Sequence, residues 1–158
     1  MSHFPVEICI DARDDAAVRT AASAARLGGA DRIELCSAMH LDGLTPDPRH
    51  IGIARDAFRD RPGLLVMVRP RDGDFSYDAD EIDLMAGQIE LAHQHRADGV
   101  VFGVLRASDS RIAVAPMRRL VDVARGRDLA VTCHRALTPR PTRTGLSTRS
   151  STSASTGC

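Results

Sequence analysis

Short apolar runs and longer amphipathic stretches alternate along the first 136 residues of the chain. The apolar runs have the length and the aliphatic or β-branched content of buried strands. They are Val6–Ile10, Arg32–Cys36, Leu64–Val68, Gly99–Phe102 and Leu129–Cys133. The stretches between them place apolar residues on one face, as amphipathic helices do. These predicted helices are Asp14–Leu27, Pro48–Phe58, Asp78–His95 and Val114–Arg125.

Two segments of the chain also have similar sequences. Gly29-Ala30-Asp31-Arg32-Ile33-Glu34-Leu35 is similar to Arg96-Ala97-Asp98-Gly99-Val100-Val101-Phe102, and each segment follows a helix and opens a strand. The later strands begin about 30 residues apart, which is the length of a βαβ unit with parallel strands and right-handed crossovers. A doubly wound sheet and a (β/α)8 barrel both fit this pattern.

Polar positions on the strands favour the barrel. The first two predicted strands carry a polar residue or a cysteine at every second position: Glu7, Cys9 and Asp11, then Arg32, Glu34 and Cys36. A parallel sheet covered by helices on both faces is expected to be almost continuously apolar. Polar residues near the carboxyl ends of strands are typical of the mouth of a TIM-type barrel, where active sites lie. Such a barrel needs about 250 residues, and only about five of its eight βα units are visible.

Composition changes sharply after Ala136. All 21 acidic residues precede Leu137, whereas eleven of the 22 residues from Leu137 to Cys158 are Ser or Thr. A disordered tail explains this composition. A shifted reading frame explains it more specifically, because back-translating the tail and reading it one nucleotide later allows an amphipathic helix followed by Leu-Gly-Val-Asp-Arg-Val. We therefore expect residues 1–136 to be a partial barrel domain and residues 137–158 to be a frameshifted, disordered segment.

Charge and cysteine spacing exclude several classes of protein. Residues 1–136 carry 18 Arg against the 21 acids, so neither a nucleic-acid-binding surface nor a membrane span is expected. None of the four cysteines forms a C-x-x-C pair, which excludes a zinc ribbon. With no apolar leader after Met1, the sequence predicts a cytoplasmic protein with reduced thiols.

Candidate chemistry gathers where the predicted strands end. Glu7, Glu34 and His134 are candidate acids or bases, although an ion-pair network inside the barrel explains the two glutamates as well. A small anionic ligand is the expected partner of five further residues, with structural salt bridges as the alternative. These five are Arg32, Arg69, Arg71, Asp74 and Arg135.

Seven ordered motifs carry a resemblance to a known family. They are Glu7-Ile8-Cys9-Ile10-Asp11, Gly28-Gly29-Ala30-Asp31-Arg32-Ile33-Glu34-Leu35-Cys36, Gly43-Leu44-Thr45-Pro46, Arg69-Pro70-Arg71, Gly73-Asp74-Phe75, Asp98-Gly99-Val100-Val101-Phe102-Gly103-Val104-Leu105 and His134-Arg135-Ala136. From about residue 6 to residue 136, the chain resembles the CutC copper-homeostasis family. The shifted-frame peptide also resembles that family's continuation, and the family's last three βα units are missing from the chain.

The resemblance implies a cytoplasmic TIM-type barrel that handles copper, with no established catalytic activity. It implies Cu(I) as the bound ion and Cys9 and Cys36 as its ligands. On adjacent strands and at similar depth, two soft thiolates suit Cu(I), although buried cysteines also serve as small core residues. Three readings stay open: a copper-binding barrel, a barrel enzyme acting on a small anionic substrate, and a truncated product without function. A homo-oligomer of the full-length parent is also left open.

Overall fold

Five parallel strands, each joined to the next through a helix, form one sheet in the computed structural model, which describes residues 4–59 and 62–134. The strands are β1 (Glu7–Asp11), β2 (Arg32–Cys36), β3 (Leu64–Met67), β4 (Gly99–Phe102) and β5 (Ala130–Cys133). The helices are α1 (Asp15–Leu27), α2 (Pro48–Phe58), α3 (Ala79–Gln94) and α4 (Val114–Arg125), with a short 3-10 helix, η1 (Met39–Leu41), after β2. The strands lie in chain order, β1-β2-β3-β4-β5. The elements predicted from the sequence are confirmed, with boundaries that move by at most one residue.

Local signals explain where the helices begin. The Asp14 side chain accepts a hydrogen bond from the amide of Ala17 and caps α1. Pro48 stands in the first turn of α2, where its missing N–H costs nothing. At the start of α3, Asp78 and Glu81 form a reciprocal capping box. These caps satisfy amides that a helix leaves without an internal partner.

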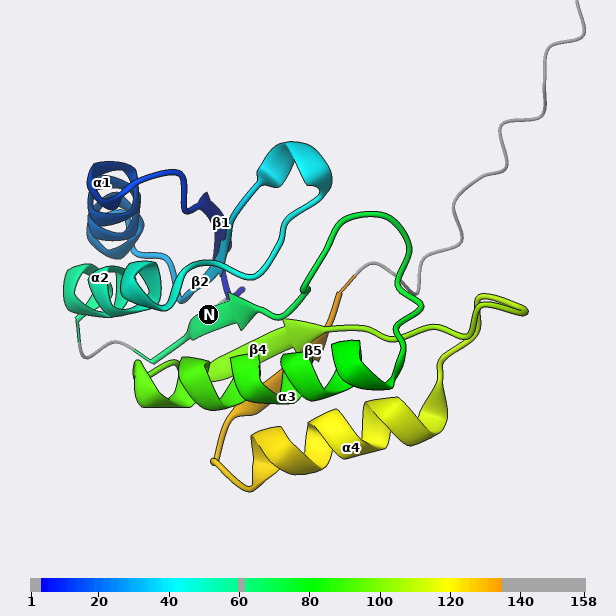
Figure 1. Ribbon diagram of the computed structural model, residues 1–158. Helices are drawn as coiled ribbons and strands as arrows, with labels where there is room; N and C mark the ends of the chain where they lie inside the picture. Colours follow the sequence, from blue (N-terminus) through cyan, green and yellow to red (C-terminus); the bar gives the residue numbers. More distant parts are fainter. Residues whose placement is uncertain (1–3, 60–61, 135–158) are drawn as a thin grey trace, which may run out of the picture.

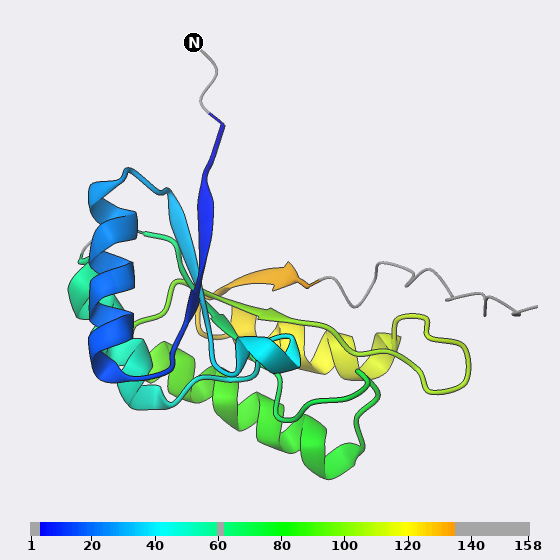
Figure 2. The same ribbon diagram turned by 90° about the horizontal axis from the view of Figure 1, so that it is seen from above.

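All four helices cover the same face of the sheet, with α1 beside α2 and α3 beside α4 (Figures 1 and 2). The main core lies between the helices and that face. Its largest fully buried members include Phe58, Ile33, Leu64, Phe102 and Leu120. A doubly wound sheet would carry helices on both faces. The helices on one side and the consecutive strand order therefore identify an open section of a (β/α)8 barrel, of which about five units are present.

The opposite face of the sheet corresponds to the inside of the barrel and is less uniformly apolar. A small buried cluster occupies its middle and consists of Cys36, Leu65, Met67 and Val101. Gly99 on β4 allows close strand packing there, because a Cβ atom at that position would lie 2.8 Å from the carbonyl oxygen of Ala130 and from a Leu65 methyl group. The polar residues predicted for the barrel mouth lie around this cluster.

Asp31 and Asp98, which occupy equivalent positions in the two similar segments, accept equivalent hydrogen bonds at the amino ends of the strands. Asp31 accepts a hydrogen bond of 2.7 Å from the amide of Val6, just before β1. Asp98 accepts hydrogen bonds of 2.7 Å from the amides of Gly63 and Leu64, where β3 begins. Each carboxylate thus satisfies an amide at the start of a neighbouring strand, which gives the repeated sequence a structural reason.

Candidate functional site

A cavity of about 350 Å³ opens at the carboxyl ends of the strands, on the inner face of the sheet. Its lining comes from β1 to β5 and from the loops that follow β2, β3 and β5. The lining residues are Glu7, Cys9, Glu34, Cys36, Met39, Asp42, Met67, Arg69, Phe75, Val101, Thr132, Cys133 and His134. A second hollow lies on the solvent side of α4 between Val114 and Val123. It has no converging polar groups from other elements, so the cavity at the strand ends, hereafter the mouth cavity, is the candidate site.

Cys9 and Glu34 face each other across the first two strands. They are register partners in the β1–β2 pair, and the Cys9 thiol donates a hydrogen bond of 3.6 Å to Glu34 Oε2. Burial and the adjacent Glu34 carboxylate raise the pKa of Cys9 to about 11, because both disfavour a thiolate. Cys9 is therefore a protonated thiol at neutral pH, with a carboxylate beside its proton.

Cys36 lies deeper, at the end of β2, where it is 2% exposed. Its thiol lies 3.7 Å from the carbonyl oxygen of Ile10 and 3.0 Å from the Met39 sulfur. Burial, followed by the negative charge of Glu34, raises the pKa of Cys36 to about 12. The strand register corrects one expectation: Cys36 lies opposite Asp11, two residues beyond the partner of Cys9. The two cysteines are thus diagonal neighbours and not at the same depth.

The three candidate acids or bases all line the mouth cavity. Burial raises the pKa of Glu34 despite the hydrogen bond from Cys9. Glu7 forms an ion pair of 3.0 Å with Arg32, which is the pairing that a barrel-lining network requires. The His134 ring packs against Phe75, with 4.8 Å between ring centroids. The structure therefore brings Glu7, Glu34 and His134 to one site, and their catalytic role stays a prediction.

Arg69 is almost completely buried, and its guanidinium group joins two loops. It donates hydrogen bonds to the carbonyl oxygens of Leu41 at 2.7 Å and Gly43 at 3.1 Å, and to that of Gly73 at 2.9 Å. The guanidinium carbon also lies 4.8 Å from the centre of the Phe75 ring, a cation–π contact. These contacts favour loop anchoring, one of the two roles that the sequence left open for Arg69.

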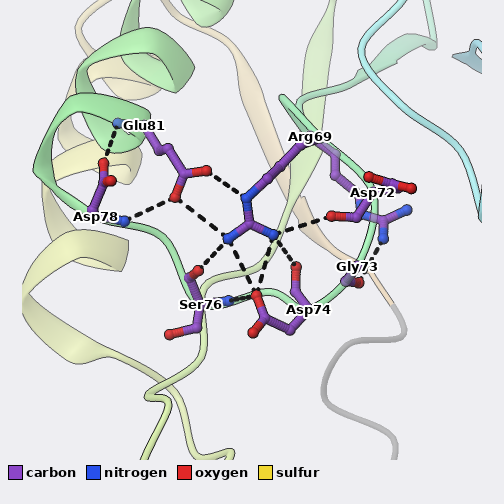
Figure 3. Close-up of polar contacts among 8 residues, drawn as sticks. Arg69, Asp72, Gly73, Asp74, Ser76, Asp78 and Glu81 are labelled. Atoms are coloured by element: carbon purple, nitrogen blue, oxygen red, sulfur yellow. Dashed lines mark hydrogen bonds and ion pairs between the residues drawn. The ribbon is translucent and has the colours of Figure 1, made fainter.

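Arg71 is held in the same way, but by side chains. The Arg71 guanidinium group donates hydrogen bonds to the carboxylates of Asp74 and Glu81, which Figure 3 labels together with Ser76 and Asp78. Arg71 also donates a hydrogen bond of 2.6 Å to the carbonyl oxygen of Ser76. Arg71 and Asp74 both lie outside the described lining of the mouth cavity. Their donors and acceptors are engaged with each other and with α3, while Arg135 and the predicted tail lie outside the described residues.

The sequence did not single out three sulfur-bearing residues that line the mouth cavity: Met39, Met67 and Cys133. Cys133 could have been found, because it ends the fifth predicted strand just as Cys36 ends the second. Met39 follows Cys36 by three residues but lies outside the predicted strands and helices, so no periodicity of a strand or helix predicted that its side chain lines the cavity. With Cys9 and Cys36, they bring all three described cysteines and two methionines into one cavity.

The lining of the mouth cavity carries thiol and thioether sulfur beside carboxylates. Within residues 4–59 and 62–134, no group of three or more His, Cys, Asp or Glu side chains is arranged to hold a metal. Cu(I) favours thiolate and thioether sulfur. The sulfur atoms of Cys9, Cys36 and Met39 are donors of the type that Cu(I) favours, and a bound Cu(I) ion would have to displace the protons of the thiols.

Known proteins similar to this chain share one family. The family model described as CutC matches residues 4–143. The family protein CutC of Vibrio cholerae is 42% identical over 134 residues, covering 84% of this chain and 49% of that protein. The family protein CutC of Bacteroides thetaiotaomicron is 40% identical over 136 residues, covering 86% of this chain and 51% of that protein. The chain thus spans about half the length of the curated relatives it matches.

The fold gives the same assignment. A crystal structure of CutC from Streptococcus agalactiae, a protein named for a proposed role in copper homeostasis, superposes with a TM-score of 0.71 at 27% sequence identity. The superposition covers 85% of this chain and 60% of that one. In the part of the chain that the structure describes, none of the helices has both the length and the apolar character needed to cross a bilayer. The family model spans most of the sequence, and the chain therefore belongs to the CutC family.

Proposed function

We propose that the mouth cavity binds Cu(I) and that the protein handles copper in the cytoplasm. The observation that carries the proposal is the gathering of three cysteines and two methionines around one cavity. Cys9 and Cys36 are the proposed thiolate ligands. The name of the similar S. agalactiae protein, which refers to copper homeostasis, supports copper as the ion.

The residues around the thiols suit an exchange of a proton for a metal ion. Both cysteines are protonated at neutral pH, since their pKa values are raised to about 11 and about 12. Binding of Cu(I) to a thiol breaks an S–H bond, forms an S–Cu bond and releases one proton without a change of oxidation state. Glu34 Oε2 accepts the hydrogen bond of Cys9 and is placed to receive its proton.

Anaerobic titration with Cu(I) in the presence of a chromophoric chelator tests this proposal. The wild-type chain is expected to withdraw one equivalent of Cu(I), and the Cys9→Ser/Cys36→Ser double variant to withdraw none. Cys158→Ser serves as the thiol-number control, and urea unfolding of each variant checks that it remains folded. Unchanged stoichiometry in a folded double variant contradicts the proposal.

Acid–base chemistry on a small ligand is the second candidate function, and the raised pKa of Glu34 inside the mouth cavity favours it. Glu34 is then the acid or base, and His134 lies on the same cavity. A screen of small carboxylates and phosphates by thermal shift tests this candidate. A metabolite that raises the melting temperature of the wild type but not that of Glu34→Gln supports it. A screen without such a metabolite counts against it.

A further inference from the structure

A direct sulfur–sulfur contact in the mouth cavity joins Cys36 to Met39. Cys36 Sγ lies 3.0 Å from Met39 Sδ. Cys36 is buried at the end of β2, whereas Met39 is 44% exposed. A methionine that serves only as core filling would be buried, as Met67 and Met85 are. Met39 instead leaves much of its apolar surface in water while its sulfur reaches the thiol.

The backbone that turns Met39 back over Cys36 is strained. Ala38, immediately before η1, has φ of 49°, and Asp42, immediately after it, has φ of 68°. Few residues other than glycine occupy this left-handed region, and an alanine there is less favourable than an aspartate. Such strain persists only where the surrounding structure fixes it, and it gathers at ligand sites.

Two sets of hydrogen bonds fix this turn. Ser37 and Leu44 exchange backbone hydrogen bonds of 2.9 and 2.7 Å and close the loop at its base. The buried Arg69 guanidinium binds the carbonyl oxygens of Leu41 and Gly43 within the loop. Gly43 has φ of +86°, a backbone conformation that residues with side chains rarely adopt. The loop therefore holds the Met39 thioether beside the thiol.

We propose that the thioether of Met39 is a ligand of the bound ion, so that Cys36 and Met39 act as a two-sulfur chelate for Cu(I). This inference rests on the proposed function of the mouth cavity. Cys36 exchanges its proton for the metal, and Met39 contributes a lone pair and has no proton to lose. As a neutral donor, the thioether adds a sulfur ligand to the cysteine thiolates without adding further negative charge beside Glu34.

Met85 provides a matched control. It is fully buried on α3 in the main core and does not belong to the lining of the mouth cavity. Met39→Leu and Met85→Leu each replace a thioether with a hydrocarbon of similar volume, an exchange that cores usually tolerate. Only the first removes the sulfur that lies 3.0 Å from the Cys36 sulfur.

The test measures Cu(I) affinity by competition with a chromophoric chelator, and sulfur coordination by X-ray absorption on the loaded chain. Since outer-shell partners of a metal ligand already contribute about 10–100-fold to affinity, loss of a ligand should weaken Cu(I) binding at least about tenfold. Met39→Leu is expected to show this loss and one fewer sulfur neighbour. Met85→Leu is expected to keep the wild-type affinity and sulfur count.

The outcomes separate the two proposals. If the cysteine double variant loses Cu(I) while Met39→Leu keeps both the wild-type affinity and the sulfur count, Met39 is not a ligand and the proposed function stands. If the wild-type chain binds no Cu(I), both proposals fail. Equal weakening by Met39→Leu and Met85→Leu also overturns the inference, because it shows a general effect of replacing a methionine in the fold.

Discussion

The Asp98 carboxylate, which precedes β4, accepts a hydrogen bond of 2.7 Å from the amide of Leu64, the first residue of β3. The same oxygen also binds the amide of Gly63 and the guanidinium group of Arg55. Three donors at the amino end of the sheet thus depend on one side chain. A buried donor that is left without an acceptor lowers the stability of the folded state.

Replacement of Asp98 is therefore expected to destabilise the fold. Asp98→Ala should lower the free energy of unfolding by about 3 kcal/mol, because hydrogen bonds to charged groups contribute roughly 1.5–3 kcal/mol and Arg55 loses its ionic partner. Asp31→Ala, at the equivalent position of the repeat, should cost less, since Asp31 binds the amide of Val6 at an exposed site. Urea unfolding measures both. Equal losses for the two variants would contradict the ranking.

The reactivity of Cys9 should respond to the charge of Glu34. Burial is the largest cause of the raised pKa of Cys9, and Glu34 adds to it through its charge and its hydrogen bond. Glu34→Gln removes the charge, so it should lower the pKa of Cys9 and speed its alkylation by iodoacetamide at pH 8. Mass spectrometry of the Cys9 peptide separates this rate from those of the other cysteines.

Glu7→Gln is the matched control for that measurement, because Glu7 makes the smallest of the contributions to the pKa of Cys9. Its alkylation rate at Cys9 should lie much closer to that of the wild type. An alkylation rate that is the same in Glu34→Gln and in the wild type would show that the carboxylate does not act on the thiol.

The Arg71–Glu81 pair predicts a pH-dependent contribution to stability. Hydrogen bonding to Arg71 lowers the pKa of Glu81 below its ordinary value of 4.5. A carboxyl group with a lowered pKa stabilises the fold above its unfolded-state pKa, and this contribution disappears as the pH falls through the folded-state value. Glu81→Gln should therefore be less stable than the wild type at pH 7, and the difference should vanish in acid below pH 4.5.

Glutamine at position 81 still accepts the amide hydrogen bond of the capping box, so the comparison isolates the charge. Thermal unfolding across pH measures it. Asp83→Asn, which removes a partner of Arg119 in an exposed ion pair, is the control and should have a smaller effect at pH 7. A gap between wild type and Glu81→Gln that persists unchanged in acid would refute the assignment.

The outer strands predict self-association. Within the described residues β1 pairs only with β2 and β5 only with β4, and Ile8 on β1 is 41% exposed. Exposed strand edges of this kind recruit other chains. Under reducing conditions, light scattering is expected to show a mass that rises with concentration, and Ile8→Lys should suppress the rise. A soluble monomer that melts cooperatively would contradict this expectation.

The same light-scattering measurement can be made on a chain whose reading frame is restored after Ala136. We expect the restored frame to supply further βα units, as the shifted-frame reading of residues 137–158 predicts. Ile8→Lys should then have no favourable effect on solubility, because Ile8 becomes covered. Sequencing of the coding DNA gives an independent check: a downstream frame that encodes no barrel-like sequence would remove the basis for the shift.

Much of the fold could be predicted from the sequence because its signals are local. Strand lengths, apolar helix faces and the caps at Asp14 and Asp78 depend on neighbouring residues, and the observed boundaries follow them. Of the six alternating residues on the first two strands, Glu7, Cys9, Glu34 and Cys36 line one cavity, whereas Asp11 and Arg32 lie outside its described lining.

The remaining features depend on contacts between distant segments. The register between β1 and β2 places Cys9 opposite Glu34 and not opposite Cys36. Neither strand contains a residue from which this register could be predicted. Arg69 donates its hydrogen bonds to backbone carbonyl groups. Because every residue has such a group, the partners of Arg69 could not be predicted from residue types. The contact between Met39 and Cys36 requires left-handed backbone at Ala38, a residue type that gives no signal for that conformation.

The position of Arg69 has a mechanical consequence. One guanidinium group holds the loop that carries Met39 and also the loop that carries Gly73, and it lies on Phe75, which in turn packs on His134. Movement of the loop after β2 is therefore coupled, through the buried Arg69 side chain, to the loop after β3 and through Phe75 to His134 at the end of β5. Amides in these separate segments are expected to exchange with solvent in concert, so that the mouth of the barrel opens and closes as one unit.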